Sequence, residues 1–273
     1  MSLQTASLNS GSNGNCYYVG NEHEAVLIDA GISCRETERR MNGLSLSMRK
    51  VKAIFISHEH SDHIRGVEML SKKYRLPVYI TERTLSFSRL KIDPTLVRRF
   101  KASETTDIGA LRITSFLKNH DAIDPHSFVV SGMGVNIGVF TDIGEPCEQL
   151  ISHFKSCHAA YLEANYDDQM LENGRYPYHL KKRIAGNKGH LSNAQALQLF
   201  LEHGSESLKH LFLSHLSKDN NNPDLVQALF TAHTVSTNIV VASRYEATEI
   251  FSVSASPSLQ TNQKARQTTL FEF

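Results

Sequence analysis

The stretch VKAIFISHEHSDHIRG, residues 51–66, decides the fold of this chain. Its first part, 51–56, is apolar and rich in β-branched residues, which is typical of a buried strand. The strand ends at HEHSDH, residues 58–63, and apolar residues at helical spacing follow it. We therefore expect a core strand that delivers three imidazoles and one carboxylate to a loop, with Asp62 near the start of a helix.

The HEHSDH segment has the residue types of a metal site. In an extended loop alternate residues point the same way, so His58 and His60 can face one metal, while Asp62 and His63 at the turn can face a second. Imidazole and carboxylate ligands without thiolates suit Zn²⁺, Mn²⁺ or Fe²⁺. The alternative is a polar surface loop rich in histidine, and four ligand-type residues within six positions at the end of a core strand argue against it.

The composition is that of an ordinary soluble globular protein. The 273 residues, 40% of them hydrophobic and 21% charged, are enough for one large domain or two small ones. The net charge is +1, so binding to a polyanion requires a local basic patch. Four scattered cysteines predict free thiols in a reducing compartment, with Cys16 and Cys34 buried. No export signal or membrane span is evident, which favours the cytoplasm.

Strands and helices alternate along most of the chain. Strands are expected at 3–8, 16–20, 25–31, 51–56, 76–80, 97–117, 127–132, 135–140, 159–165, 209–216, 238–243 and within 245–253, and helices at 34–50, 82–91 and 145–156 and after Asn222. A further helix is capped by Ser192 with Gln195, and Leu197, Phe200 and Leu201 are expected on its buried face. We predict one domain, residues 1–253, built as two βα halves, and a flexible tail, 254–273.

Several predicted strands end in ligand-type residues. Asp29, His120, Asp142 and His215 each follow an apolar strand. One such residue at a strand end is usually structural, but a series of them after HEHSDH indicates that ligands gather along one edge of a sheet.

A basic run occupies residues 175–188, RYPYHLKKRIAGNK, with five Lys or Arg and no acid. It is either a solvated helix face or a surface that follows nucleic-acid phosphates, with Tyr176 and Tyr178 available to stack bases. The Ser/Gly/Asn loop 9–15 is likewise either a hairpin turn, which its composition favours, or a nest of backbone N–H groups for phosphate.

The last seven residues, QTTLFEF, form an apolar cluster at the end of a polar tail. Gln267, Leu270 and Phe271 resemble the short motif by which bacterial DNA-maintenance proteins dock on the sliding clamp. The alternative is a frayed end or a last edge strand.

The spacing His58-x-His60-x-Asp62-His63 resembles the HxHxDH signature of the metallo-β-lactamase superfamily. Within it, the chain is most similar to the WalJ/YycJ-like group of bacterial nuclease-type proteins. This likeness spans about residues 3–250 and is carried by SGSNGNCYYV (10–19), TDIG (141–144), LEANYDDQMLENGRYP (162–177), KKRIAGNKGHLSN (181–193) and SHLSKDNN (214–221). Members often have Asn-His-Asp where this chain has Asn165-Tyr166-Asp167, so no role for that histidine is carried over.

The resemblance implies an α/β (α+β) fold, a four-layer αββα sandwich, with two divalent metal ions, Zn²⁺ or Mn²⁺. His58, His60 and His120 would hold one metal, and Asp62, His63 and His215 the other. Asp142 would bridge them, and Asp29 would support the metal loop through hydrogen bonds. Two such cations activate a water and clamp a phosphodiester.

The same resemblance implies roles beside the metals. Asp62 would orient the nucleophile, and His190 would protonate the leaving oxygen or bind the scissile phosphate, unless His190 merely caps the next helix. Substrate contacts are expected from Asn15, Arg175, Lys181, Lys182, Arg183 and Asn193.

The favoured function is a 5′-to-3′ exonuclease acting on single-stranded DNA in repair or replication. An RNA endonuclease of the tRNA 3′-end type ranks second, because the chain has no long inserted arm to grip tRNA. A hydroxyacylglutathione-type thioester hydrolase is disfavoured by FLKNHDAID around His120 and by the basic run. A non-catalytic clamp-docking module is disfavoured because all seven ligand positions are filled.

Overall fold

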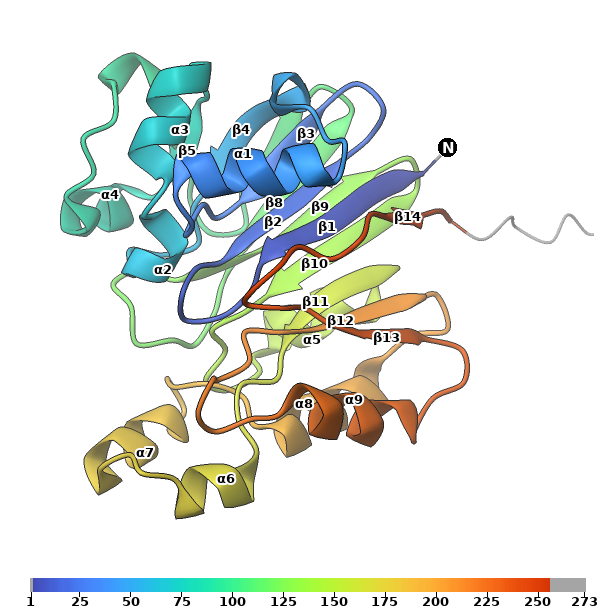
Figure 1. Ribbon diagram of the computed structural model, residues 1–273. Helices are drawn as coiled ribbons and strands as arrows, with labels where there is room; N and C mark the ends of the chain where they lie inside the picture. The colour runs from blue at the N-terminus through green and yellow to red at the C-terminus, as the bar shows by residue number, and fades with distance from the viewer. Residues whose placement is uncertain (1, 256–273) are drawn as a thin grey trace, which may run out of the picture.

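The computed structural model describes residues 2–255 and contains two seven-stranded sheets that pack face to face (Figure 1). The first sheet has the strand order β14 (Phe251–Val253), β1 (Leu3–Asn9), β2 (Cys16–Gly20), β3 (Ala25–Ile28), β4 (Val51–Phe55), β5 (Val78–Ile80) and β6 (Val97–Arg99). The second has the order β13 (Asn238–Val241), β12 (His210–Ser214), β11 (Ala159–Glu163), β10 (Val135–Phe140), β9 (His126–Gly132), β8 (Leu111–Leu117) and β7 (Thr105–Ile108).

The two sheets share one pattern of pairing. In the first sheet the pairs from β14 to β3 are antiparallel and those from β3 to β6 are parallel. In the second, the pairs from β7 to β10 are antiparallel and those from β10 to β13 are parallel. Two similar halves therefore face each other, as the sequence predicts.

Helices α1 (Cys34–Gly43) and α3 (Val67–Tyr74) cover the outer face of the first sheet, and α5 (Glu148–Lys155), α8 (Asn193–His203) and α9 (Pro223–Thr231) cover that of the second (Figure 1). The first half also contains α2 (Ser61–Ile64) and α4 (Glu82–Ser88), with short 3₁₀ turns η1 (Met48–Lys50) and η2 (Pro94–Leu96). The second half also contains α6 (Asp168–Asn173) and α7 (Tyr178–Ile184). Every helix within residues 2–255 is too short or too polar to cross a membrane.

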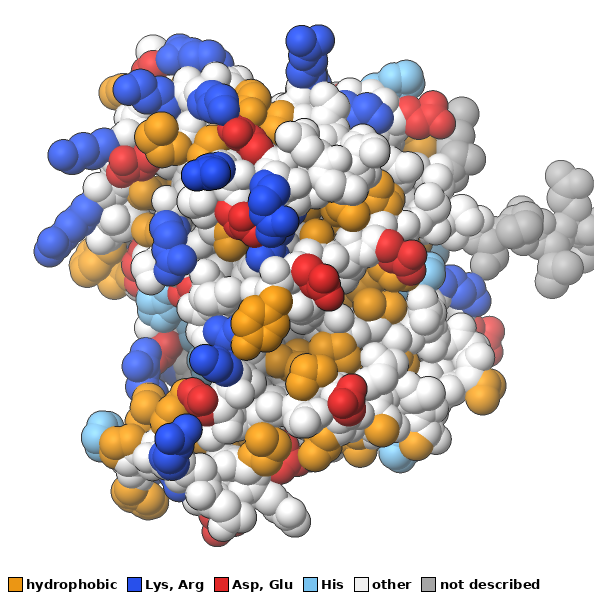
Figure 2. Space-filling view, in the orientation of Figure 1, with side chains coloured by type: hydrophobic (Ala, Val, Ile, Leu, Met, Phe, Trp, Pro, Cys, Tyr) orange, Lys and Arg blue, Asp and Glu red, His pale blue; other side chains and the backbone are white. Residues whose placement is uncertain are grey.

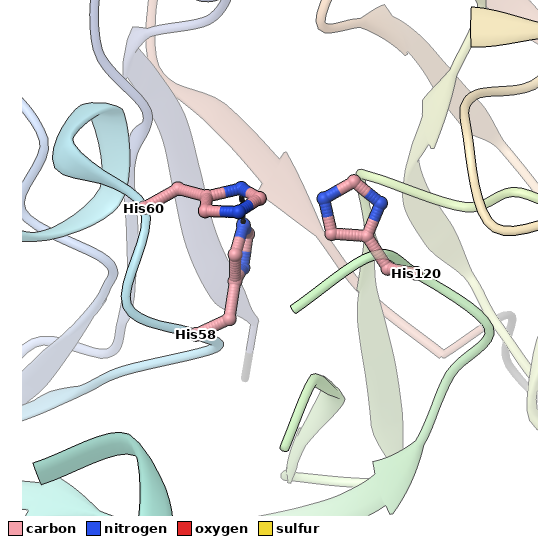
Figure 3. A group of neighbouring side chains, drawn as sticks. All are labelled: His58, His60 and His120. Carbon is pink, nitrogen blue, oxygen red and sulfur yellow. Dashed lines mark hydrogen bonds between the residues drawn. The ribbon is translucent and has the colours of Figure 1, made fainter. Parts of the chain in front are cut away.

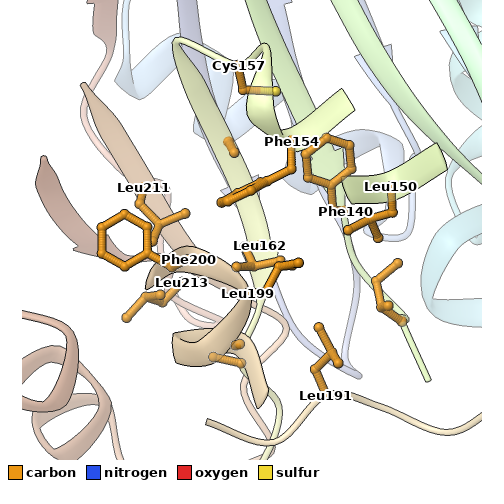
Figure 4. Packing of buried hydrophobic residues seen from close by; sticks show 14 of the residues in the cluster. Phe140, Leu150, Phe154, Cys157, Leu162, Leu191, Leu199, Phe200, Leu211 and Leu213 are labelled. Atoms are coloured by element: carbon orange, nitrogen blue, oxygen red, sulfur yellow. The ribbon is translucent and has the colours of Figure 1, made fainter. Parts of the chain in front are cut away.

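Three apolar cores separate the four layers. The middle core joins the two sheets, and Tyr17 of β2 meets Tyr161 of β11 there with ring centroids 4.7 Å apart. One outer core lies between the first sheet and α1 and α3. The other lies between the second sheet and α5, α8 and α9, where Phe140, Phe154 and Leu199 pack together (Figure 4). The predicted αββα sandwich is thereby confirmed.

The carboxyl ends of β3, β4, β8, β10, β11 and β12 meet at one rim between the two halves. In sheets with parallel strands this is the edge at which ligands bind, because the loops that follow the strands converge there. Helices α6 and α7 project beyond the sandwich beside this rim, at the lower left of Figure 1.

Some local predictions need correction. The predicted helix 34–50 ends at Gly43, where Leu44 caps it and Ser45 turns with a φ of +57°. The Ser192–Gln195 capping box of α8 is confirmed. Its buried face, however, is formed by Ala196, Leu199 and Phe200, and Leu197 packs only partly against it.

Leu201 is 52% exposed, because one further helical residue rotates the side chain by about 100° away from Phe200. All four cysteines are free, and Cys16 is buried as predicted. Cys34 is only partly buried, because it is the first residue of α1.

Candidate metal centre

The rim gathers seven ligand-type side chains from both halves of the molecule. The loop after β4 and the start of α2 supply His58, His60, Asp62 and His63, while the second half supplies His120 after β8, Asp142 after β10 and His215 after β12. Figure 3 shows His58, His60 and His120 turned toward one another from opposite sides of the rim. Local sequence contributes to this placement, because the ligand-type residues lie in segments that follow the carboxyl ends of β4, β8, β10 and β12.

The donor atoms form overlapping groups in which they lie within 4.8 Å of one another. These groups are His58–His60–His120, Asp62–His63–His215 and His58–His63–Asp142, with a fourth of Asp142, Glu163, His190 and His215. Asp142 lies between the others, with Oδ2 3.0 Å from His63 Nε2 and Oδ1 3.4 Å from His215 Nδ1. His120 Nε2 is 3.8 Å from Asp142 Oδ1.

Three residues at the rim have a left-handed backbone. Asp29, Asp142 and His215 have φ values of +58°, +55° and +57°, in the left-handed region that non-glycine residues rarely adopt. Such strain persists only where the surroundings hold it, and it concentrates at functional sites. The sequence carries no signal for these conformations.

Asp29 holds the loop after β4 in place. Its Oδ1 accepts a hydrogen bond of 2.8 Å from the Ser57 backbone N–H, and Oδ2 accepts one of 2.8 Å from the Ser57 hydroxyl. His63 Nδ1 lies 2.7 Å from Asp29 Oδ2, and since a carboxylate only accepts, Nδ1 donates. The Nε2 atom of His63 is thereby directed to the rim.

Glu163, the last residue of β11, is a fully buried part of the site that the sequence reasoning missed. Its Oε1 accepts from His190 Nδ1 and His215 Nδ1, both at 2.8 Å. Its Oε2 accepts from the backbone N–H of Ile143 at 2.6 Å and of Leu191 at 3.2 Å. A glutamate within the apolar strand AAYLE was the available signal, because a buried carboxylate requires several partners.

Electrostatics divide the histidines into two kinds. Burial lowers the pKa of His58 well below its usual range and that of His120 to about 4, so both rings are neutral and able to donate a lone pair. Burial also disfavours the charged form of His63, but Asp142, Asp29 and Asp62 outweigh it and raise its pKa to about 10.

The pKa of His215 is raised in the same way, because Asp142, Asp62 and Glu163 favour its charged form despite burial. Glu163 is desolvated too, yet His190 and His215 hold its pKa down at about 2. The rim therefore combines carboxylates with protonated imidazoles, and a bound cation would take the place of these protons.

The residues present fit divalent metal ions. The Nε2 atoms of His120 and His215 are buried and have no hydrogen-bond partner within residues 2–255, although an orphaned buried polar atom is costly. Five imidazoles and two carboxylates without a thiolate are the donor set that Zn²⁺ and Mn²⁺ share.

A cavity of about 230 Å³ opens beside this group. Its walls include Tyr176, Arg183 and His190 from the α6–α8 region and Ser12 and Ser217 from the facing loops. His190 is the more accessible partner of Glu163, with 22% of its side chain exposed. In Figure 2, histidine lies in a notch at the left edge of the molecule, with Lys and Arg side chains on both sides.

The predicted substrate residues divide between this cavity and the rest of the surface. Arg183 lines the cavity, and its Nε lies 2.5 Å from Asp121 Oδ2. Arg175 and Lys182 are exposed on the α6–α7 segment, and Lys181 Nζ donates to the Glu172 carbonyl. The basic run thus borders the cavity mainly through Arg183.

Two predicted substrate residues lie elsewhere than expected. Asn15 is buried at the metal centre, with Nδ2 3.1 Å from His63 Nε2 and 3.3 Å from Asp62 Oδ2. Asn193 is 2% exposed, and its amide is bonded to that of Asn221, so it joins α8 to the loop before α9 instead of facing the cavity. The sequence alone did not show these positions, because an asparagine beside a loop can bind a substrate or can form hydrogen bonds within the protein.

Loop 9–15 forms the hairpin turn between β1 and β2, and three of its backbone N–H groups are bonded within the protein. The Gly14 N–H donates to the Gly11 carbonyl, the Asn15 N–H to the Asp62 carbonyl, and the Gly11 N–H to the Asn15 side chain. These N–H groups are consumed inside the protein. The motif Gln267, Leu270 and Phe271 lies outside the described residues.

Comparisons with known proteins agree with this geometry. Residues 24–215 match the family described as the beta-lactamase superfamily domain. The chain is 34% identical over 232 residues to exodeoxyribonuclease YycJ of Bacillus anthracis, covering 83% of this chain and 87% of that protein. It is 32% identical over 223 residues to exodeoxyribonuclease WalJ of Streptococcus pneumoniae strain D39, covering 80% and 83%.

Among solved structures, the metallo-β-lactamase fold protein YhfI from Bacillus subtilis superposes with a TM-score of 0.70. The match covers 92% of this chain and 100% of that one at 14% identity, which shows a shared fold. The family match spans the rim from β3 to His215, and the relatives match over most of their own length. The chain therefore belongs to the metallo-β-lactamase superfamily, in the family of the YycJ and WalJ proteins.

Proposed function

We propose that this protein is a metal-dependent phosphodiesterase, a DNA exonuclease that degrades single-stranded DNA from its 5′ end in repair or replication. The observation that carries the proposal is the cavity of about 230 Å³ beside the seven ligand-type residues, with Arg183 and His190 on its walls. Two relatives of similar length are named exodeoxyribonucleases, which supports DNA as the substrate.

Divalent cations bound by the rim residues would polarise a phosphodiester and lower the pKa of a coordinated water. The chain supplies the remaining functions. Asp62, with 17% of its side chain exposed, is placed to orient the attacking water through one carboxylate oxygen. Arg183, held beside the centre by Asp121, would bind a phosphate oxygen in place of that carboxylate.

His190 is the proposed proton donor to the leaving oxygen. Its Nδ1 donates to Glu163, which fixes the ring and leaves Nε2 to carry the transferred proton. Glu163 also binds His215, so one buried carboxylate positions both the proton donor and a candidate metal ligand. A histidine that merely caps α8 would have no need of this partner, because Ser192 and Gln195 already form the cap.

A substrate panel with a metal titration tests the proposal. With Mn²⁺, the purified protein should release the label of 5′-labelled single-stranded DNA in a short product at once, whereas 3′-labelled DNA should shorten progressively from its unlabelled 5′ end. His58→Ala and Asp142→Ala should abolish cleavage with the fold retained. His23→Ala, which changes an exposed histidine in the β2–β3 hairpin, is the matched control and should cleave normally.

Other outcomes would overturn this assignment. A precursor tRNA cut far faster than any DNA would make the protein an RNA-processing endonuclease. Hydrolysis of a glutathione thioester at ordinary enzyme rates would place it among thioester hydrolases. If His58→Ala cleaves DNA as fast as wild type, the metal centre takes no part in the reaction.

The proposed partner in the cell is the DNA sliding clamp, bound through Gln267, Leu270 and Phe271. This part of the proposal is supported by the sequence QTTLFEF alone. Deleting residues 267–273 should remove clamp binding in a pull-down assay and leave turnover of short DNA intact. Unchanged capture of the clamp by the shortened chain would refute it.

A further inference from the structure

A second cavity, of about 220 Å³, adjoins the first at the ends of β12 and β13. Its floor is apolar and includes Leu216, Val241 and Ala242. Its entrance is lined by Lys218, Arg244 and Tyr245. Ser217 lines both cavities, so the second one lies beside the first.

The segment 243–245, which borders the second cavity, is held firmly in place. After β13 the chain crosses from the second sheet to β14 of the first (Figure 1). Three successive carbonyls of this crossing accept hydrogen bonds: Ser243 from the Ser10 N–H, Arg244 from Asn13 Nδ2, and Tyr245 from Arg40 Nη2, at 3.1, 2.8 and 2.8 Å.

The residues that hold these carbonyls are themselves tied to the metal centre. Ser10 and Asn13 belong to the loop that ends at Asn15, and Asn15 contacts Asp62 and His63. The second cavity is therefore fixed relative to the metal centre, as a binding site for an extended substrate requires.

The positively charged side chains of Lys218 and Arg244 are available to bind an anionic ligand. Within residues 2–255 neither Lys218 nor Arg244 forms an ion pair. Arg244 Nη2 donates to Ser12, a wall of the first cavity, while its Nη1 is buried without a hydrogen-bond partner among the described residues. The neighbouring carboxylate of Asp219 accepts a hydrogen bond from Tyr176.

Tyr245 supplies a flat apolar surface at the same place. Its side chain is 68% exposed, although a large aromatic side chain loses favourable burial by facing water. An aromatic ring, an apolar floor and unpaired cations are the combination with which proteins bind single-stranded nucleic acid, because the ring stacks on a base and the cations contact phosphates.

We propose that the second cavity binds one nucleobase of a single-stranded nucleic acid, on a nucleotide next to the one held in the first cavity. Tyr245 stacks on this base, and Arg244, between the two cavities, binds the phosphate that joins the two nucleotides. The inference rests on the proposed nuclease function and adds to it a second base subsite. It follows that strands long enough to reach the second cavity bind more tightly than shorter ones.

Steady-state kinetics on substrates of two lengths test this subsite. The full chain with Mn²⁺ would be given the single-stranded decamer (dT)₁₀ and the p-nitrophenyl ester of thymidine 5′-monophosphate, a phosphodiester with a single nucleotide that cannot reach the second cavity. Tyr245→Ala and Arg244→Gln should each raise KM for the decamer roughly tenfold or more, with kcat unchanged. Neither should change KM for the single-nucleotide ester, and Tyr245→Phe, which keeps the ring, should behave as wild type on both substrates.

Matched controls separate the subsite from general surface effects. Phe87→Ala removes an aromatic side chain that is 63% exposed on α4, and Arg49→Gln removes an exposed cation from η1. Both should leave the decamer KM unchanged. If Tyr245→Ala and Arg244→Gln also leave it unchanged, or if they alter both substrates equally, the subsite does not exist.

Binding measured without turnover keeps this test separate from that of the proposed function. Fluorescence anisotropy with labelled (dT)₁₀ reports affinity whether or not DNA is cleaved. Wild type that binds the decamer but does not cut it would overturn the exonuclease assignment and retain the subsite, provided that Tyr245→Ala weakens binding. If the protein cleaves DNA but wild type and both variants bind the decamer with equal affinity, the exonuclease assignment stands and the subsite is overturned.

Discussion

Glu163 is the residue on which the proton donor and a candidate metal ligand both depend. Its two oxygens accept four hydrogen bonds, from two imidazoles and two backbone N–H groups. Glu163→Gln keeps the shape but exchanges one acceptor oxygen for a donor NH₂, which opposes the N–H groups that faced it. We expect a free energy of unfolding lower by about 2–4 kcal/mol and a kcat on DNA lower by roughly 100-fold.

Rescue by a conservative variant distinguishes positioning from a purely structural role. Glu163→Asp keeps the negative charge beside the two imidazoles and should recover part of kcat, whereas Glu163→Gln should not. Glu202→Gln is the matched control, since it changes the exposed glutamate beside His203 on α8. A wild-type kcat in Glu163→Gln with only a loss of stability would restrict Glu163 to a structural role.

At this scale the sequence identified residue types better than it identified roles. The candidate ligands were predictable, because histidine and aspartate at the ends of apolar strands stand out against their surroundings. Asn193 and Asn15 were not, since hydrogen bonds to Asn221 and to the metal centre depend on tertiary contacts. The left-handed backbone of Asp142 and His215 is likewise set by the packed rim and not by local preference.

At the scale of elements, helix α1 anchors the segment that borders the second cavity. The Arg40 guanidinium donates to the Leu8 carbonyl and Asn9 Oδ1, both at 2.6 Å, and to the Tyr245 carbonyl. Arg40→Met would leave these acceptors without a partner, so we expect a loss of about 2–4 kcal/mol in the free energy of unfolding. Urea denaturation of Arg39→Met, exposed one position earlier in the helix, is the control and should differ little from wild type.

Helix α8 starts at a capping box that the sequence predicted in full. Ser192 accepts from the Gln195 N–H, and the Gln195 side chain accepts from the Ser192 N–H. Ser192→Ala should therefore lower the free energy of unfolding by about 1 kcal/mol, whereas Ser192→Thr should largely retain it. Equal urea midpoints for the two variants would mean that the cap contributes nothing.

Boundaries of elements were less predictable than their existence. Strong local signals such as Ser192–Gln195 or Asn222–Pro223 located helix starts correctly. The end of α1 at Gly43 was missed because it depends on a turn at Ser45. The exposure of Leu201 was missed because it depends on which face of α8 packs on the second sheet.

At the scale of the whole molecule, the metal centre joins the two halves of the sandwich. His58, His60, Asp62 and His63 come from the first half, and the other candidate ligands come from the second. The sequence anticipated this arrangement, because the order of strand ends along the chain implied two βα units that share an edge. The facing of the sheets themselves, through contacts such as Thr5 with Tyr161, is visible only in the folded protein.

Metal binding should therefore stabilise the fold as a whole. A ligand that binds only the native state adds RT ln(1 + [L]/Kd), which is about 2.7 kcal/mol at a metal concentration of 100 Kd. For a chain of this size that corresponds to a rise in Tm of roughly 5–10 °C. Calorimetry should show this rise with Mn²⁺ or Zn²⁺ and its reversal by a chelator, and His58→Ala should reduce it while His23→Ala preserves it. A Tm that neither metal nor chelator changes would show that the rim binds no cation in the native state, since tight binding confined to this state must raise the free energy of unfolding.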